Sequence, residues 1–214
     1  MGICLTKAFI FDFDGTLVDS EQAIYLCFKS ITKQLAPNRV EHAKNILIGP
    51  PLRDTASEIL GPDHQDSLDE FVQLFITMHD EEVIKHTQPY PNVMQVLKQF
   101  HSQNIPMAVA TNKRLVPTKK LIDHFDWNDY FQTIECSDSN PKMRSKDGMI
   151  QDIISQKSEF SASYFVGDTV NDGLSANSNQ LKFIKACYGY GRNQDWSKVC
   201  IFKKIYSFSE IDDI

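Results

Sequence analysis

The sequence has little that would place the chain in or across a membrane. Its apolar runs stay well short of the roughly 18 residues that a membrane-spanning helix needs. The amino terminus has no long apolar core behind a basic region, which a secretory signal would show. These absences predict a soluble protein that is neither exported nor bound to a membrane, and we expect it to be cytoplasmic.

Cysteine usage excludes two further kinds of protein. The five cysteines are odd in number, and no two of them form a Cys-x-x-Cys pair. They are scattered along the chain as Cys4, Cys27, Cys136, Cys187 and Cys200. Such spacing indicates neither a disulfide framework nor a zinc site, and it favours a reducing compartment.

Positive charge is also in short supply. There are 22 Lys and Arg against 28 Asp and Glu, which gives a net charge of -6. Binding to nucleic acid or to an anionic membrane needs a concentrated basic surface, so we expect neither partner. The 214 residues, 42% of them hydrophobic, suffice for one large domain or for one domain with an insert.

Hydrophobic periodicity divides the chain into two kinds of segment. Residues from about 20 to 86 have only helical patterns, and Gln88–Asn92, with two prolines, ends this helical block. In the remainder, short apolar runs alternate with helical stretches. Strands are expected at residues 8–10, 105–110, 131–135, 164–166 and 181–186. The alternation predicts an α/β fold with a parallel sheet.

Polar side chains follow the expected strands at their carboxyl ends, where open parallel sheets bind ligands. Asp12 and Asp14 follow the first strand and, being two residues apart, point to the same side. Thr111-Asn112-Lys113 follows the second strand, and Gly167-Asp168 follows the fourth. Taken singly, each segment also suits an ordinary strand end or helix start. Together they indicate a site that handles phosphate.

Such a site needs cations, because attack of a carboxylate on a phosphate dianion brings like charges together. Mg²⁺ prefers oxygen ligands, and Asp168 is the leading direct ligand. Asp172, one turn further on, could bind the metal through water or orient a lysine. Lys142 and Lys146 are both candidates for that lysine. We favour Lys146 because it opens an expected helix whose apolar side aims it at the strand ends.

In combination, the motifs resemble those of the haloacid dehalogenase superfamily of phosphohydrolases. The family's Asp-x-Asp-Gly-Thr motif matches Asp12–Thr16, its second matches Thr111-Asn112, its third is a lysine, and its fourth matches Gly167–Asp172. The helical block looks like the small α-helical (C1) cap of the subgroup that contains phosphoglycolate phosphatase. The resemblance implies a Rossmann-like core of residues 1–17 and 89–214, with a cap formed by residues 18–88.

The resemblance also implies a mechanism. Asp12 would attack phosphorus and form an aspartyl phosphate, and Asp14 would act as general acid and then as general base. Mg²⁺ would be held by Asp12, the backbone carbonyl of Asp14, and Asp168. Thr111, Asn112 and the lysine would hold the other phosphate oxygens.

The identity of the substrate is the more open question. Arg53, in the cap, could bind a carboxylate or a second phosphate, although an exposed arginine paired with acids is an equal interpretation. Lys113 is also placed to face a substrate. The resemblance favours phosphoglycolate among small phosphorylated metabolites, and we expect a monomer or homodimer.

Several alternative functions fit the same catalytic residue types. They are a 5'-nucleotidase, a pyrophosphatase, a sugar phosphatase, a phosphomutase and, from a different class, a phospho-acceptor signalling domain. A signalling domain needs neither a second carboxylate such as Asp14 nor a cap, which favours the phosphatase.

Overall fold

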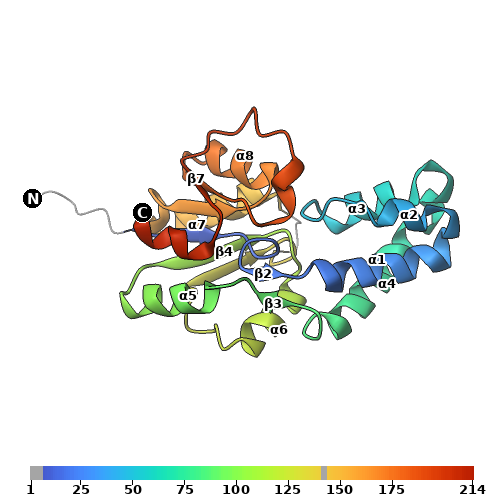
Figure 1. The fold of residues 1–214 in the computed structure, drawn as a ribbon, viewed down its shortest axis with the longest axis horizontal. Helices are drawn as coiled ribbons and strands as arrows, with labels where there is room; N and C mark the ends of the chain where they lie inside the picture. Colours follow the sequence, from blue (N-terminus) through green and yellow to red (C-terminus); the bar gives the residue numbers. More distant parts are fainter. Residues whose placement is uncertain (1–6, 141–143) are drawn as a thin grey trace, which may run out of the picture.

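The computed structural model describes residues 7–140 and 144–214, and a six-stranded parallel sheet lies at its centre (Figure 1). The strand order is β5-β4-β1-β6-β7-β8. The strands are β1 (Phe9–Phe11), β4 (Met107–Thr111), β5 (Thr133–Cys136), β6 (Tyr164–Gly167), β7 (Lys182–Ala186) and β8 (Lys203–Ile205). The predicted α/β class is confirmed, and each of the five expected strands is present within a few residues of its expected bounds.

The edge strand β8 was missed by the sequence analysis. It contains only three residues, two of them the lysines Lys203 and Lys204. A strand this short and polar carries no alternation of apolar and polar residues from which it could be predicted. It is recognised only through its parallel pairing with β7.

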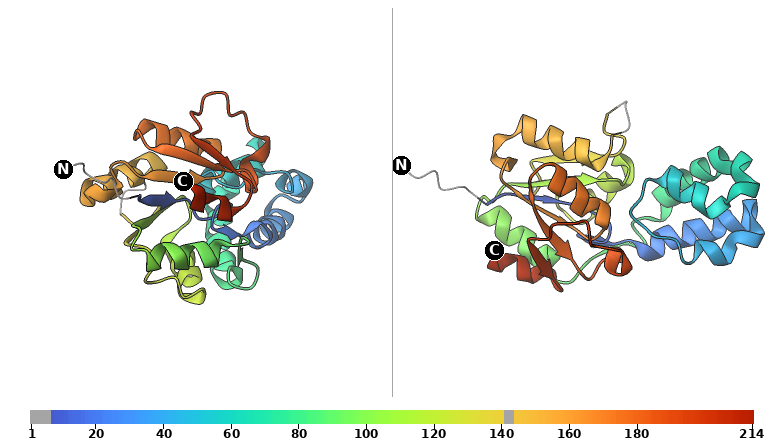
Figure 2. Two further views of the ribbon diagram at one scale, coloured as in Figure 1. Left: turned by 60° about the vertical axis from the view of Figure 1, so that its left-hand side comes forward. Right: turned by 90° about the horizontal axis from the view of Figure 1, so that it is seen from above.

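Helices cover both faces of the sheet, as the views in Figure 2 show. The residues of β1 alternate between the faces: Phe9 and Phe11 join the core beneath α5 and α6, whereas Ile10 joins the core beneath α7 and α8. The bounds are α5 (Val93–Ser102), α6 (Leu115–His124), α7 (Lys146–Gln156) and α8 (Val170–Ser178). The sheet is therefore buried on both sides, as parallel sheets require.

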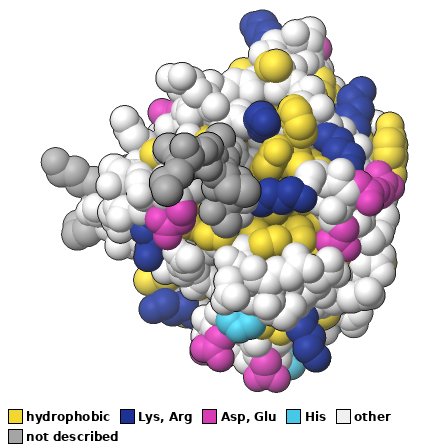
Figure 3. Space-filling model, turned by 90° about the vertical axis from the view of Figure 1, so that its left-hand side faces the viewer, with side chains coloured by type: hydrophobic (Ala, Val, Ile, Leu, Met, Phe, Trp, Pro, Cys, Tyr) yellow, Lys and Arg dark blue, Asp and Glu magenta, His cyan; other side chains and the backbone are white. Residues whose placement is uncertain are grey.

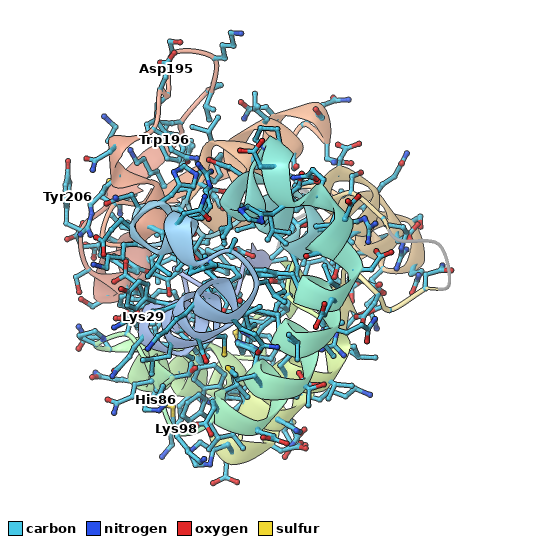
Figure 4. All side chains as sticks on the ribbon, turned by 90° about the vertical axis from the view of Figure 1, so that its right-hand side faces the viewer. Lys29, His86, Lys98, Asp195, Trp196 and Tyr206 are labelled. Carbon is cyan, nitrogen blue, oxygen red and sulfur yellow. The ribbon has the colours of Figure 1, made fainter. Side chains whose placement is uncertain are left out.

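The predicted helical block lies at one end of the molecule and has a hydrophobic core of its own (Figures 1 and 2). It consists of α1 (Glu21–Leu35), α2 (Val40–Ala43), α3 (Leu52–Leu60) and α4 (Leu68–Glu82). Figure 4 looks onto this block, with the labelled Lys29 on the exposed side of α1. Short 3-10 helices are η1 (Pro37–Arg39), η2 (Pro62–Ser67), η3 (Ser158–Phe160), η4 (Tyr190–Asn193) and η5 (Phe208–Asp213).

The chain enters and leaves the helical block through one two-stranded ribbon. β2 (Val18–Asp19) pairs antiparallel with β3 (Gln88–Pro89), so the two connecting segments lie side by side. This pairing gives the block a double attachment at a single place. We propose on this basis that residues 18–88 form a cap on a core made of residues 1–17 and 89–214.

Two properties of the structure concern the membrane and nucleic-acid partners that the sequence does not lead us to expect. Within the described ranges, every helix is too short or too polar to cross a lipid bilayer. On the face shown in Figure 3, away from the helical block, Lys and Arg side chains are scattered among acidic and apolar ones.

The separate core of the helical block yields a stability prediction. Phe71 is fully buried in it, so Phe71→Ala should lower the free energy of unfolding by about 3–5 kcal/mol through lost burial and a residual cavity. Leu26→Ala, at a 38% exposed position of α1, is the matched control and should change it by no more than about 0.5 kcal/mol. Urea unfolding followed by circular dichroism measures both. Equally small losses of unfolding free energy in the two variants would contradict the assignment of Phe71 to this core.

Candidate active site

The carboxyl ends of three adjacent strands bring the predicted residues together. Because β1 lies between β4 and β6, Asp12 emerges between Thr111 and Asp168. The backbone N–H of Asp12 donates to the carbonyl of Val166 at 2.8 Å, which continues the strand pairing up to the site. The side chains of Asp12, Thr111 and Asp168 are all buried.

Lys146 connects two of the buried carboxylates. It is the first residue of α7, whose N-cap Ser145 accepts a hydrogen bond from the Gly148 backbone N–H. Its Nζ donates to Asp12 Oδ1 at 2.7 Å and also to Asp172 Oδ1. Burial alone would lower the pKa of Lys146, but the two carboxylates raise it above its usual value, so the ammonium stays charged.

Asp172 is held by the start of α8 in a capping box. The Thr169 hydroxyl donates to Asp172 Oδ2 at 2.7 Å, and the backbone N–H groups of Thr169 and Asp168 donate to the same oxygen at 2.8 and 3.1 Å. The other oxygen of Asp172, Oδ1, accepts a hydrogen bond from Lys146 Nζ. Both oxygens of Asp172 therefore have protein partners, which suits an anchor for the lysine.

Asp168 lies against the turn that follows Asp14. It accepts a hydrogen bond from the Tyr190 backbone N–H at 2.6 Å, and Gly15 packs directly on its carboxylate. Gly15 has φ +83°, and a Cβ there would lie 2.4 Å from Asp168 Oδ2. Only glycine combines this backbone conformation with so close an approach.

Three buried carboxyl groups share the cluster with the single ammonium group of Lys146. Carboxylate oxygens of Asp12, Asp168 and Asp172 lie within 4.8 Å of one another. Burial raises the pKa of Asp12 to about 7, with Asp172 adding to the rise and Lys146 opposing it. The pKa of Asp168 is raised well above its usual value, again chiefly by burial. The hard oxygen donors of Asp12 and Asp168 fit a divalent cation such as Mg²⁺, whose positive charge would favour their ionised forms.

Asp14 lies beside this cluster with different partners. Lys113 Nζ donates to its two carboxylate oxygens at 3.0 and 3.1 Å, and the Ser20 hydroxyl donates at 2.6 Å. Thus Lys113, expected to face the substrate, contacts a carboxylate in this arrangement. The sequence analysis gave no role to Ser20, which lies four residues after the first motif.

The second motif also reaches the helical block. Asn112 Nδ2 donates to the carbonyl of Gly49, in the loop before α3, at 2.9 Å. Thr111 Oγ1 accepts the backbone N–H of Lys113 at 3.1 Å. The side chain of Asn112 therefore connects the sheet edge to the helical block.

A cavity of about 90 Å³ lies between the sheet edge and the helical block. Its sheet side presents the polar groups of Asp12, Asp14, Asn112, Lys113 and Lys146. Its helical side is mostly apolar and includes Ile24, Phe28, Ile48, Leu52 and Phe75. The lining also includes Gly49, Pro50 and Pro117, together with three polar residues that the sequence analysis left without a role, Thr55, His79 and Arg114.

Arg53 does not line this cavity. The Arg53 side chain is 56% exposed and forms an ion pair with Asp69 at 2.7 Å, so it is the exposed arginine paired with an acid that was the alternative to a substrate-binding role. Lys142 lies outside the described residues. The structure therefore gathers Asp12, Asp14, Lys146 and their partners, and it leaves Arg53 on the surface.

The burial of His79 predicts a pH dependence of stability. Burial, together with the nearby cations Lys113, Arg114 and Lys120, lowers its pKa to about 2, so the folded protein keeps the ring neutral. The unfolded chain binds a proton below about pH 6.5, whereas the folded chain does not. Because only the unfolded chain takes up this proton, the free energy of unfolding decreases as the pH falls below about 6.5.

His79→Phe removes this term. As the pH falls from 6 to 4, the free energy of unfolding of His79→Phe, relative to that of the unsubstituted protein, should rise by about 1 kcal/mol for each pH unit. Urea unfolding at a series of pH values measures the difference. A difference independent of pH would mean that the ring is protonated in the folded protein.

Comparison with known proteins gives the family. The profile described as haloacid dehalogenase-like hydrolase matches residues 9–186. A phosphoglycolate phosphatase from Psychrobacter arcticus is 25% identical over 214 residues, covering 95% of this chain and 93% of its own. One from Photobacterium profundum is 27% identical, with 97% and 95% covered.

Solved structures agree on the fold. A predicted phosphoglycolate phosphatase from Haemophilus somnus superposes with a TM-score of 0.85 at 22% identity, over 99% of both chains. Protein tyrosine kinase A from Mycobacterium tuberculosis also shares the fold, with a TM-score of 0.78 at 21% identity over 97% of each chain. The family profile covers most of the chain and spans all four motifs. The chain therefore belongs to the haloacid dehalogenase-like hydrolases, as its motifs indicate.

Proposed function

We propose that this hydrolase is a magnesium-dependent phosphatase that cleaves a small phosphomonoester through an aspartyl phosphate, with 2-phosphoglycolate as its substrate. The observation that carries the proposal is the buried group of Asp12, Lys146, Asp168 and Asp172, of which Asp12 and Lys146 line the cavity. A phosphate placed there would meet a nucleophile, a fixed cation and a metal site together.

Asp12 is the proposed nucleophile. One of its carboxylate oxygens would form a bond to phosphorus while the ester oxygen leaves. Lys146 fixes the orientation of this carboxylate and favours its ionised form, against the burial that raises its pKa. Asp172 acts through Lys146, because both of its oxygens already hold protein donors.

Asp14 is the proposed general acid and base. It would give a proton to the leaving oxygen and later take one from the water that hydrolyses the aspartyl phosphate. Ser20 and Lys113 fix its position. We also assign Lys113, with Thr111 and the Asn112 amide, to the phosphate oxygens, since Asn112 and Lys113 line the cavity.

Mg²⁺ would be held by Asp12, Asp168 and the backbone carbonyl of Asp14, and it would supply positive charge that lets a carboxylate approach a phosphate dianion. The convergence of buried carboxyl groups supports this assignment, because burial raises the pKa of Asp12 and Asp168 and a bound cation would favour their ionised forms.

The lining of the cavity supports a small phosphomonoester. Its charged groups gather on the sheet side, and apolar side chains of the helical block line the other side. Its helical side is mostly apolar, which disfavours the second phosphate site of a phosphomutase. Relatives named phosphoglycolate phosphatase, at 25–27% identity, point to the same substrate.

The proposed activity has a direct test. Phosphate release should depend on Mg²⁺ and should be fastest with 2-phosphoglycolate in a panel that also contains nucleoside monophosphates, pyrophosphate, sugar phosphates and an aryl phosphate. Asp12→Asn is the control and should be inactive with every compound. Preference for a nucleotide or pyrophosphate would overturn the substrate, and activity of Asp12→Asn would overturn the nucleophile.

The choice between the two lysines has its own test. Lys146→Ala should lower kcat by a factor of roughly 100 or more, because an oriented cation at the reacting phosphate is lost. Lys142→Ala is the matched control and should retain most of the activity. Circular dichroism of both variants verifies the fold. A large loss in Lys142→Ala with a small loss in Lys146→Ala would reverse the assignment.

A further inference from the structure

His79, on the last helix of the cap, is the feature of the cavity that the proposed mechanism leaves unused. Its side chain is 3% exposed, and its Nε2 has no hydrogen-bond partner among residues 7–140 and 144–214. The ring stacks on Phe75, with centroids 5.1 Å apart. A buried polar atom without a partner costs stability and is uncommon. Because His79 also lines the cavity, a ligand bound there is the candidate partner for this atom.

The charges around His79 indicate what kind of atom it would meet. Lys113 and Arg114 line the same cavity, and Lys120 lies on α6 nearby. Asp80, the next residue of α4, is engaged by Arg114 Nη1 at 3.1 Å and, through its carbonyl, by Lys120 Nζ at 2.6 Å. The ring itself is neutral, as its lowered pKa requires. A neutral ring among cations suits an oxygen acceptor that carries negative charge.

We propose that His79 determines substrate specificity by donating a hydrogen bond from Nε2–H to a carboxylate oxygen on the leaving group of the phosphomonoester. The inference rests on the proposed function and extends it to the non-reacting end of the substrate. The apolar side chains of Phe75 and Leu52 would enclose the short carbon chain between that carboxylate and the phosphate. Arg53, on the surface and paired with Asp69, is not needed for this recognition.

Calorimetry separates binding from turnover. Asp12→Asn protein in Mg²⁺ would be titrated with 2-phosphoglycolate and with ethyl phosphate, which has the same length and no carboxylate. Adding His79→Phe should weaken the binding of 2-phosphoglycolate roughly ten- to a hundredfold, which is the contribution expected of one hydrogen bond to a charged group. The affinity for ethyl phosphate should be nearly unchanged. Equal effects on the two ligands, or equal affinities before the substitution, would overturn the inference.

Two further measurements exclude a purely structural role. His79→Gln, whose amide N–H can reach a similar position, should recover part of the affinity for 2-phosphoglycolate. His79→Phe keeps a ring to stack on Phe75 and removes the unpaired atom, so its Tm at neutral pH should be unchanged or higher. A lower Tm with equal losses for the two ligands would assign His79 to packing alone.

Turnover distinguishes this inference from the proposed function. In the otherwise unsubstituted enzyme, His79→Phe should raise KM for 2-phosphoglycolate while changing kcat little, because the hydrogen bond is present before and during reaction. If no phosphomonoester is hydrolysed but the calorimetric difference holds, the proposed function fails and the inference stands. If 2-phosphoglycolate is hydrolysed and KM is unaffected by His79→Phe, the inference alone fails.

Discussion

The hydrogen bonds from Lys146 to Asp12 and Asp172 are the interaction on which the rest of the site depends. Three buried carboxylates within 4.8 Å would repel one another strongly, and their desolvation alone favours protonation. Lys146 donates hydrogen bonds to Asp12 and Asp172 and so fixes the orientation of both, while a divalent cation bound beside Asp12 and Asp168 would favour their ionised forms. The fold supplies this geometry because α7 begins at Lys146, beside the carboxyl ends of β1 and β6.

The second constraint is the closeness of the cap to the sheet edge. Gly49 accepts a hydrogen bond from Asn112, and the paired segments β2 and β3 attach the cap at one place. The resulting cavity has charged groups on one side and apolar groups on the other. Under the proposed function, the core residues would bind the phosphate of any substrate, and the residues of the helical block would determine which leaving group is accepted. The shared fold of phosphatases and a tyrosine kinase illustrates that the fold alone does not determine the activity.

Much of this arrangement was predictable from the sequence, for a physical reason. Strands have a period of two residues and parallel strands end at one edge, so the residues after each apolar run had to meet. The unpredictable parts depend on contacts between distant segments. Nothing in the sequence around His79 distinguishes a core histidine from one that lines a cavity. Arg53 forms an ion pair with Asp69 on the surface and does not line the cavity. The strand β8 is defined by its neighbour and not by its own composition.

The central claim is that Asp12 becomes phosphorylated, and the aspartyl phosphate can be trapped chemically. Asp14→Asn protein, impaired in hydrolysing the intermediate, would be mixed with substrate and Mg²⁺, quenched in acid and treated with borohydride, which reduces an aspartyl phosphate to homoserine. We predict that mass spectrometry will find homoserine at position 12. Homoserine at another aspartate, or none at any position while phosphate is still released, would contradict the account.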